Sequence, residues 1–178
     1  MIRLAEQTDT PIMSTSSLRY TKGVADLVAE EEEIVFCEAF GPAPLLEDYP
    51  GLFWYGIHGA EILFSYMGPG CTAVQCAPRE EMDVVIGEWE DGRIGLLRGT
   101  RFPGGVFGCM IHTGSGLTTG QAKPGAAGYA AMLQEVVHFF ESRVSPIETQ
   151  VTLGIVSFLE AAERSRSQSG AIVRTDSL

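Results

Sequence analysis

Basic residues are scarce in this sequence. Its 178 residues include 12 Lys and Arg against 23 Asp and Glu, which gives a formal net charge of −11 at pH 7. Nucleic acids and anionic membrane surfaces are bound through clustered Lys and Arg side chains. We therefore expect neither nucleic acid nor a membrane surface as a partner of this protein.

Long apolar runs and cysteine pairs are also missing. No run of about 18 apolar residues occurs, so no segment is expected to span a membrane. The N-terminal sequence MIRLAEQTDTP lacks the basic and apolar regions of a secretory signal peptide. The cysteines form no C-x-x-C pair and no His/Cys zinc spacing. They are Cys37, Cys71, Cys76 and Cys109. These absences predict free core thiols in a cytoplasmic protein.

Nucleotide-binding and metal-binding motifs do not appear either. The segment Gly114–Gly120 has the spacing G-x-G-x-x-x-G and lies among predicted strands, without the strand–turn–helix context of a dinucleotide loop. We interpret it as a sheet hairpin and predict no cofactor-binding residues. His58, His112 and His138 are scattered, and His58 with Glu61 cannot complete a metal shell, so no metal site is predicted.

The segment Pro50–Gly68 is apolar with helical spacing, yet it contains three interior glycines. Each glycine costs a helix about 1 kcal/mol relative to alanine. A chain accepts glycine where its backbone must approach another element or a ligand closely. At helical spacing Trp54, His58 and Glu61 share one face. Two interpretations remain open: a site edge with the imidazole between an indole and a carboxylate, or a buried helix with a hydrogen-bonded core histidine.

The remaining periodicities predict the fold class. Helical spacing is found over residues 2–8, 17–29, 129–140 and from 146 to about 169. Strand patterns cover residues 11–14, 33–40, 72–77, 83–90, 93–100, 106–112, 117–121 and 171–174. Asp91-Gly92 is typical of a two-residue hairpin turn with positive φ angles. Because short links join most of the strands, we predict one α+β domain with an open, predominantly antiparallel β-sheet and helices packed on one face.

The predicted sheet has apolar residues on both faces. Val84 and Ile86 alternate with Val85 and Trp89 along one strand. Helices from the flanking segments cover one side of such a sheet, and a large bare apolar patch is unusual on a monomer. The simplest closed solution is a homodimer formed through the open sheet face.

The chain resembles, over about residues 15 to 174, the C-terminal domain of the Gfo/Idh/MocA oxidoreductases, the glucose–fructose oxidoreductase and inositol dehydrogenase family. The matching motifs occur in the family's order. They are the crossing segment Ser16–Tyr20, the G-x-H-x-x-D/E motif in Tyr55–Glu61, the hairpin Asp91–Gly95 and the closing helices at Glu135–Phe140 and Ser145–Thr149.

This resemblance implies an NAD(P)-dependent oxidoreductase acting on a sugar, polyol or related hydroxyl compound. It implies that the catalytic residue His58 contacts the reacting hydroxyl or carbonyl as acid/base or polariser, since a histidine near neutral pKa suits that proton transfer. The substrate-binding residues would be Arg19, Tyr20, Trp54, Tyr55 and Glu61. Many members have aspartate where this sequence has Trp54, so the usual Asp–His pairing is not expected.

The resemblance also implies a domain division. Residues 1–15 would be the remnant of a preceding nucleotide-binding domain and crossing segment, and residues 16–178 the substrate-binding and dimerisation domain. NAD(P) would then be bound by the full-length family protein and not by this chain alone, which we expect to be inactive alone. The alternative is a non-catalytic carbohydrate-binding or scaffold module derived from the same domain.

Overall fold

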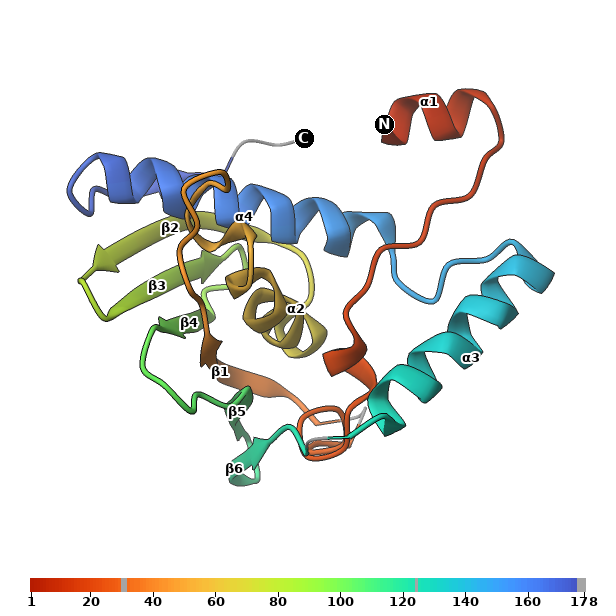
Figure 1. Ribbon diagram of the computed structural model, residues 1–178, viewed down its shortest axis with the longest axis horizontal. Helices are drawn as coiled ribbons and strands as arrows, with labels where there is room; N and C mark the ends of the chain where they lie inside the picture. The colour runs from red at the N-terminus through yellow and green to blue at the C-terminus, as the bar shows by residue number, and fades with distance from the viewer. Residues whose placement is uncertain (30–31, 124, 176–178) are drawn as a thin grey trace.

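The structure is a computed structural model that describes residues 1–29, 32–123 and 125–175. Over these ranges the chain forms a seven-stranded sheet, four α-helices and two short 3-10 helices (Figure 1). The strands are β1 (Ile34–Pro42), β2 (Cys71–Pro78), β3 (Met82–Trp89), β4 (Ile94–Thr100), β5 (Gly108–Thr113), β6 (Gly116–Gln121) and β7 (Val173–Arg174). The helices are α1 (Ile2–Gln7), η1 (Ser17–Tyr20), η2 (Gly51–Phe53), α2 (Gly56–Met67), α3 (Ala127–Ser142) and α4 (Thr149–Ser167).

The sheet has the strand order β6-β5-β1-β4-β3-β2-β7. All neighbouring strands pair antiparallel except β1 and β4, which are parallel. The predicted α+β class with an open, mostly antiparallel sheet is thus confirmed. The strands do not simply follow one another across the sheet, however, because β1 lies between β4 and β5. Periodicity identifies the faces of a strand and carries no information about its neighbours.

Helices α2 and α4 lie side by side on one face of the sheet (Figure 1). Helix α2 packs on β1, β4 and β5, and α4 packs on β2 and β7. Phe64 of α2 contacts the ring of Phe158 of α4 at 5.6 Å and that of Trp89 of β3 at 5.4 Å, measured between centroids. The buried stripe of α4 consists of Ile155, Phe158, Leu159 and Ala162.

The glycines of α2 permit its close packing, as the sequence predicted. A Cβ atom on Gly59 would lie 2.6 Å from Leu97 Cδ1 in the sheet, and one on Gly56 would lie 2.8 Å from Leu52 Cβ. Real Cβ atoms do not approach other carbons so closely. The backbone of α2 therefore lies directly on neighbouring side chains, and most of its residues are buried.

Four local predictions were wrong in detail. Residues 11–14 form no strand, and in the 17–29 segment only Ser17–Tyr20 is helical, as a 3-10 turn. The last helix begins at Thr149 rather than at Pro146, because Ser145 Oγ accepts the Ile147 N–H at 3.2 Å and forms a local turn instead of a helix cap. At the β3–β4 turn only Gly92 has a positive φ, of 88°. The turn at Ser145 has a general cause, because short polar side chains often hydrogen-bond to nearby backbone groups instead of capping a helix.

Helix α3 differs most from its neighbours in burial. Only Gly128 and Phe139 of this helix are buried, and α3 packs on η1 and stands away from the sheet (Figure 1). The apolar residues that predicted this helix are mostly on its exposed face: Tyr129, Leu133, Val137 and Phe140 are 55 to 76% exposed. None of the helices in the described ranges combines the length and hydrophobicity that a membrane span requires.

A buried ion network attaches α4 to the sheet. Asp83 of β3 is fully buried and pairs with Arg166 of α4 and with Arg101, whose Nη1 lies 3.0 Å from Asp83 Oδ2. Arg101 also donates to the carbonyl oxygens of Arg79 and Glu80. The free-energy cost of desolvating the Asp83 carboxylate is offset by its two guanidinium partners. Loss of the carboxylate would therefore leave these positive charges without this partner.

We expect Asp83→Ala to lower the free energy of unfolding by about 3–5 kcal/mol, the usual cost of breaking a buried ion pair from one side. Urea denaturation followed by circular dichroism measures this change. Asp91→Asn is the matched control, because Asp91 pairs with Arg93 at 2.7 Å on the surface, where such pairs contribute about 0–1 kcal/mol. Equal losses in the two variants would contradict a structural role for the Asp83 network.

Candidate functional site

The segment that contains the predicted crossing motif runs alongside α2 and makes three side-chain contacts with it. Ser16 Oγ lies 3.0 Å from His58 Nδ1, Arg19 pairs with Glu61, and Tyr66 Oη donates to the Val24 carbonyl oxygen. Ser16 and Arg19 are three residues apart, and so are their partners His58 and Glu61. One turn of the 3-10 helix η1 therefore lies along one turn of α2. The structure therefore brings the crossing segment and the histidine helix together.

Arg19 and Glu61 form a buried ion pair. Their side chains are 9% and 7% exposed. Burial raises the pKa of the Glu61 carboxyl, and the Arg19 guanidinium partly opposes this increase. Arg19 Nη2 and Tyr20 Oη are buried and have no hydrogen-bond partner in the part of the chain that the structure describes. Glu61 thus neutralises Arg19 and does not contact His58.

His58 is half-buried among uncharged groups. The rings of Tyr55 and Phe107 lie edge-on to the imidazole, with centroid distances of 5.4 and 5.8 Å. Burial lowers the pKa of His58 below its ordinary value. Among the described residues, Ser16 is its only hydrogen-bond partner, at Nδ1, so Nε2 is unpaired. A neutral imidazole with one free ring nitrogen can exchange a proton with a bound hydroxyl or carbonyl oxygen.

Aromatic rings continue from His58 onto the surface. Tyr55 stacks on Phe107 at 6.0 Å, and Trp54 contacts Tyr49 at 4.8 Å and Tyr55 at 6.3 Å. Tyr49, Trp54 and Tyr55 are 39 to 47% exposed. Trp54 precedes α2 and lies beyond Tyr55, so it is not adjacent to the imidazole as its helical spacing suggested. These rings and His58 form one partly exposed surface, which we call the aromatic surface.

The other predicted substrate residues lie in a different place. Arg19 and Tyr20 line a cavity of about 440 Å³ together with Ser65, Tyr66 and Glu135. His58, Trp54 and Tyr55 do not line this cavity. The six predicted site residues thus divide into two groups: His58, Tyr55 and Trp54 at the N-terminal end of α2, and Arg19, Tyr20 and Glu61 along its side.

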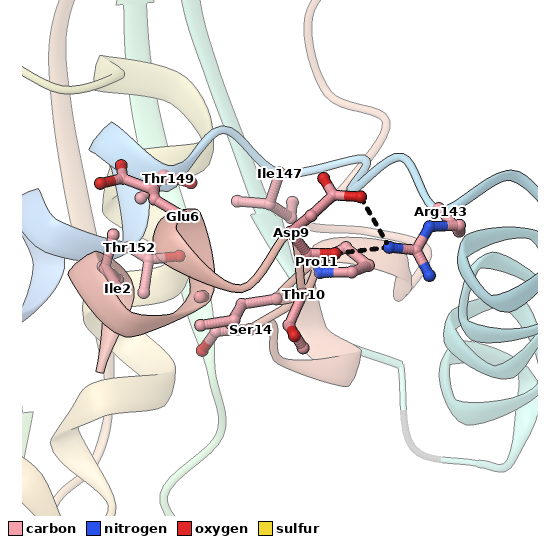
Figure 2. Close-up of a pocket in the computed structure, with 12 residues that line it drawn as sticks. Ile2, Glu6, Asp9, Thr10, Pro11, Ser14, Arg143, Ile147, Thr149 and Thr152 are labelled. Carbon is pink, nitrogen blue, oxygen red and sulfur yellow. Dashed lines mark hydrogen bonds and ion pairs between the residues drawn. The ribbon is translucent and has the colours of Figure 1, made fainter.

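A second cavity, of about 260 Å³, is formed where α1 and the following segment approach the start of α4 (Figure 2). Thr149 and Thr152 of α4 face Ile2 and Glu6 of α1 across it. Arg143 closes one end by donating to the Asp9 carbonyl oxygen at 2.5 Å. None of the predicted site residues lines this cavity, and we assign it no function.

The Gly114–Gly120 segment does not have the geometry of a dinucleotide loop. Gly114–Gly120 forms the turn and strand of the β5–β6 hairpin, in which Thr113 pairs with Gly116. This confirms the predicted hairpin, which lacks the helix N-terminus that binds pyrophosphate. Within the described ranges no three His, Cys, Asp or Glu side chains are grouped as metal ligands, and all four cysteines are free thiols.

Two residues of the site were not predicted. Ser16 is the first residue of the crossing segment but was not predicted as a site residue, and Phe107 lies in the link between β4 and β5, 49 positions after His58. A serine before a short helix is a recognisable N-cap, and Ser16 Oγ does accept the Leu18 N–H at 3.2 Å. Nothing local in the sequence indicates that Phe107 reaches the histidine, since the sheet topology makes that contact.

The site and fold together define an open-sheet α+β domain with one half-buried histidine beside a crossing segment. No family model and no curated protein matches the sequence. Solved structures do match. One is GenD2 from gentamicin A biosynthesis in complex with NAD, with a TM-score of 0.71 and 18% identity; the match covers 90% of this chain and 62% of that chain. Another is myo-inositol 2-dehydrogenase from Lactobacillus plantarum (TM-score 0.75, 12% identity, 98% and 68%).

A third is myo-inositol dehydrogenase from Lactobacillus casei in complex with NAD(H) and myo-inositol, with a TM-score of 0.69, 13% identity and coverage of 99% and 67%. The chain thus spans 62 to 68% of the length of these dehydrogenases. At these identities the likeness concerns the fold. The chain has the fold of a Gfo/Idh/MocA-type dehydrogenase domain, and the resemblance seen in the sequence is confirmed at that level.

The lowered pKa of His58 predicts a specific pH dependence of stability. At pH values below about 6.5, the ordinary pKa of histidine, the unfolded chain binds a proton at His58 more readily than the folded chain does. The free energy of unfolding therefore falls as the pH is lowered. We expect the wild type to lose more unfolding free energy than His58→Gln between about pH 7.5 and pH 5.5. Urea denaturation at several pH values measures this difference. His112→Gln, an exposed histidine of β5, is the control, and parallel profiles for wild type and His58→Gln would contradict the prediction.

Proposed function

We propose that this chain is the substrate-binding and dimerisation part of an NAD(P)-dependent oxidoreductase that acts on a sugar, polyol or related hydroxyl compound. The observation that carries the proposal is the environment of His58. Its imidazole is uncharged near neutral pH, held at Nδ1 by Ser16, and bordered by the rings of Tyr55 and Phe107. This arrangement suits a proton-transfer group for a substrate hydroxyl.

His58 Nε2 would exchange a proton with the reacting oxygen of the substrate. The aromatic surface would contact the apolar side of a ring-shaped substrate and exclude water from the imidazole. Arg19 is neutralised by Glu61, so its charge is not available to bind an anionic substrate. We propose that Arg19, Tyr20 and Glu61 support the site chiefly by fixing the crossing segment on α2.

The dinucleotide would be bound outside the described residues, since the glycine-rich segment Gly114–Gly120 is a hairpin without a helix N-terminus. Two of the matching structures are complexes with NAD or NAD(H), and one of them also contains myo-inositol. These ligands make a nicotinamide cofactor and a cyclic polyol the natural first candidates. Cytoplasmic localisation and the division at residue 15 remain predictions of the same proposal.

The open face of the sheet supports the proposed dimer. Phe36, Phe40, Ile86, Leu96 and Met110 lie on this face and remain partly exposed. One charged pair crosses the face: Arg98 Nε lies 2.8 Å from Glu38 Oε1. An apolar surface with a central ion pair fits burial against a second copy of the same sheet.

The alternative function is a non-catalytic carbohydrate-binding or scaffold module. The exposed aromatic surface favours it, because such rings bind ligands without chemistry. His58 would then be a core histidine whose bond to Ser16 only stabilises the fold. The two functions differ in whether His58 contributes to ligand binding.

We expect the 178-residue chain to bind myo-inositol, the polyol present in one matching structure, and His58→Ala to weaken this binding about fivefold. That factor corresponds to the loss of one hydrogen bond of about 1 kcal/mol. Isothermal titration calorimetry measures it, with His138→Ala, which removes an exposed histidine of α3, as the matched control. Undiminished binding by His58→Ala would favour the non-catalytic module.

We expect a dimer at micromolar concentration, with a mass by light scattering of twice the 19.2 kDa of one chain. Leu96→Glu should convert it to a monomer, because a carboxylate at the centre of the open face would be buried in the interface. Leu133→Glu on the exposed face of α3 is the control and should remain dimeric. A folded monomeric wild type would refute the dimer, and dissociation by Leu133→Glu alone would place the interface on α3.

A further inference from the structure

Ser16 is almost fully buried, with 4% of its surface exposed, and its hydroxyl makes two contacts. The Leu18 N–H donates to Oγ at 3.2 Å, which occupies one of the two acceptor positions of the oxygen. His58 Nδ1 lies 3.0 Å from the same oxygen. One hydroxyl hydrogen and one acceptor position therefore remain for the imidazole.

The direction of this hydrogen bond determines where His58 carries its proton. If Ser16 donates its hydrogen to Nδ1, both contacts of Oγ are satisfied and the imidazole proton is on Nε2. If Nδ1 donates to Ser16, the hydroxyl hydrogen needs another acceptor. The described residues provide none within hydrogen-bonding distance, and a buried donor without a partner is unfavourable.

Among the residues that the structure describes, no charged group is hydrogen-bonded to the His58 imidazole. Carboxylates that contact a histidine usually accept its Nδ1 proton and fix the opposite tautomer. The nearest candidate on α2, Glu61, is paired with Arg19 instead. Tyr55 and Phe107 contact the imidazole through uncharged rings set nearly perpendicular to it, at 89° and 83°. The serine hydroxyl is therefore the polar group that sets the state of Nδ1.

We propose that Ser16 is a positioning residue that donates its hydroxyl hydrogen to His58 Nδ1, so that the resting imidazole carries its proton on Nε2. This inference rests on the proposed function only where it concerns catalysis. In that setting resting His58 is a hydrogen-bond donor to a carbonyl or hydroxyl oxygen. To accept a substrate proton at Nε2, the imidazole first has to move its own proton to Nδ1, and Ser16 has to turn from donor to acceptor.

A serine permits this exchange, whereas a carboxylate does not. The hydroxyl can donate to bare Nδ1 or accept from Nδ1–H without a change in its own charge. The resting site is therefore matched to the binding and polarisation of a carbonyl group, and the oxidation of an alcohol includes the additional tautomer exchange. Ser16→Thr retains this property, and Ser16→Ala removes it.

The test is long-range ¹H–¹⁵N NMR on the 178-residue protein labelled at histidine nitrogens, without added ligand. The nitrogen without a proton resonates far downfield of the protonated nitrogen, so the spectrum identifies the tautomer directly. His58→Gln assigns the His58 signals among the three histidines. The variants are Ser16→Ala and Ser16→Thr, with Ser14→Ala, an exposed serine of the same segment, as the matched control.

We expect the wild type, Ser16→Thr and Ser14→Ala to have Nδ1 unprotonated and Nε2 protonated. In Ser16→Ala we expect loss of this single form, with the two nitrogen shifts moving toward each other as the tautomers mix. A proton on Nδ1 in the wild type overturns the proposal, as does a Ser16→Ala spectrum identical to wild type. If Ser16→Ala does not fold, the wild-type and Ser16→Thr spectra still decide the tautomer.

These results are independent of the proposed function. The NMR readout requires no substrate and no cofactor, so the assignment of Ser16 can hold even if myo-inositol does not bind. Conversely, polyol binding that depends on His58, together with a proton on Nδ1, would support the proposed function and refute the role of Ser16.

Discussion

The buried ion pair between Arg19 and Glu61 is the interaction on which the arrangement of the site depends. It attaches η1 to α2, and α3 in turn packs on η1. Because both side chains are buried, neither charge is stable without the other. The pair also decides the chemistry of His58, since it removes the nearest carboxylate from the imidazole and leaves the Ser16 hydroxyl as its partner.

A second constraint is the close packing of α2 on the sheet. Gly59 places the helix backbone on Leu97, so that α2 lies deep in the domain with Phe64 between α4 and β3. The N-terminal end of this helix emerges where the link after β4 brings Phe107 to the imidazole. The histidine is therefore half-buried on a rigid helix, an environment that lowers its pKa and suits proton transfer at neutral pH.

The two faces of the sheet have different roles. One is closed by α2 and α4, with the Asp83 network fixing α4 at the sheet edge. The other face combines apolar side chains with the Arg98–Glu38 pair, and no helix within the described ranges packs on it. Helix α3 likewise exposes an apolar face. The site thus lies on the helical side of a domain whose remaining apolar surfaces are suited to contacts with other protein surfaces.

The sequence by itself determined the elements whose periodicity is strong: the central helix, the five strands after it, the last helix and the open α+β class. It also made His58 and the crossing segment the candidate site, because their motif spacing is local. Tertiary structure alone decided the rest. Insertion of β1 between β4 and β5, the exposure of α3 and the approach of Phe107 depend on contacts between distant segments, which periodicity does not encode. The partner of His58 was decided in the same way: Glu61 and Ser16 were both available, and the buried charge of Arg19 required the carboxylate.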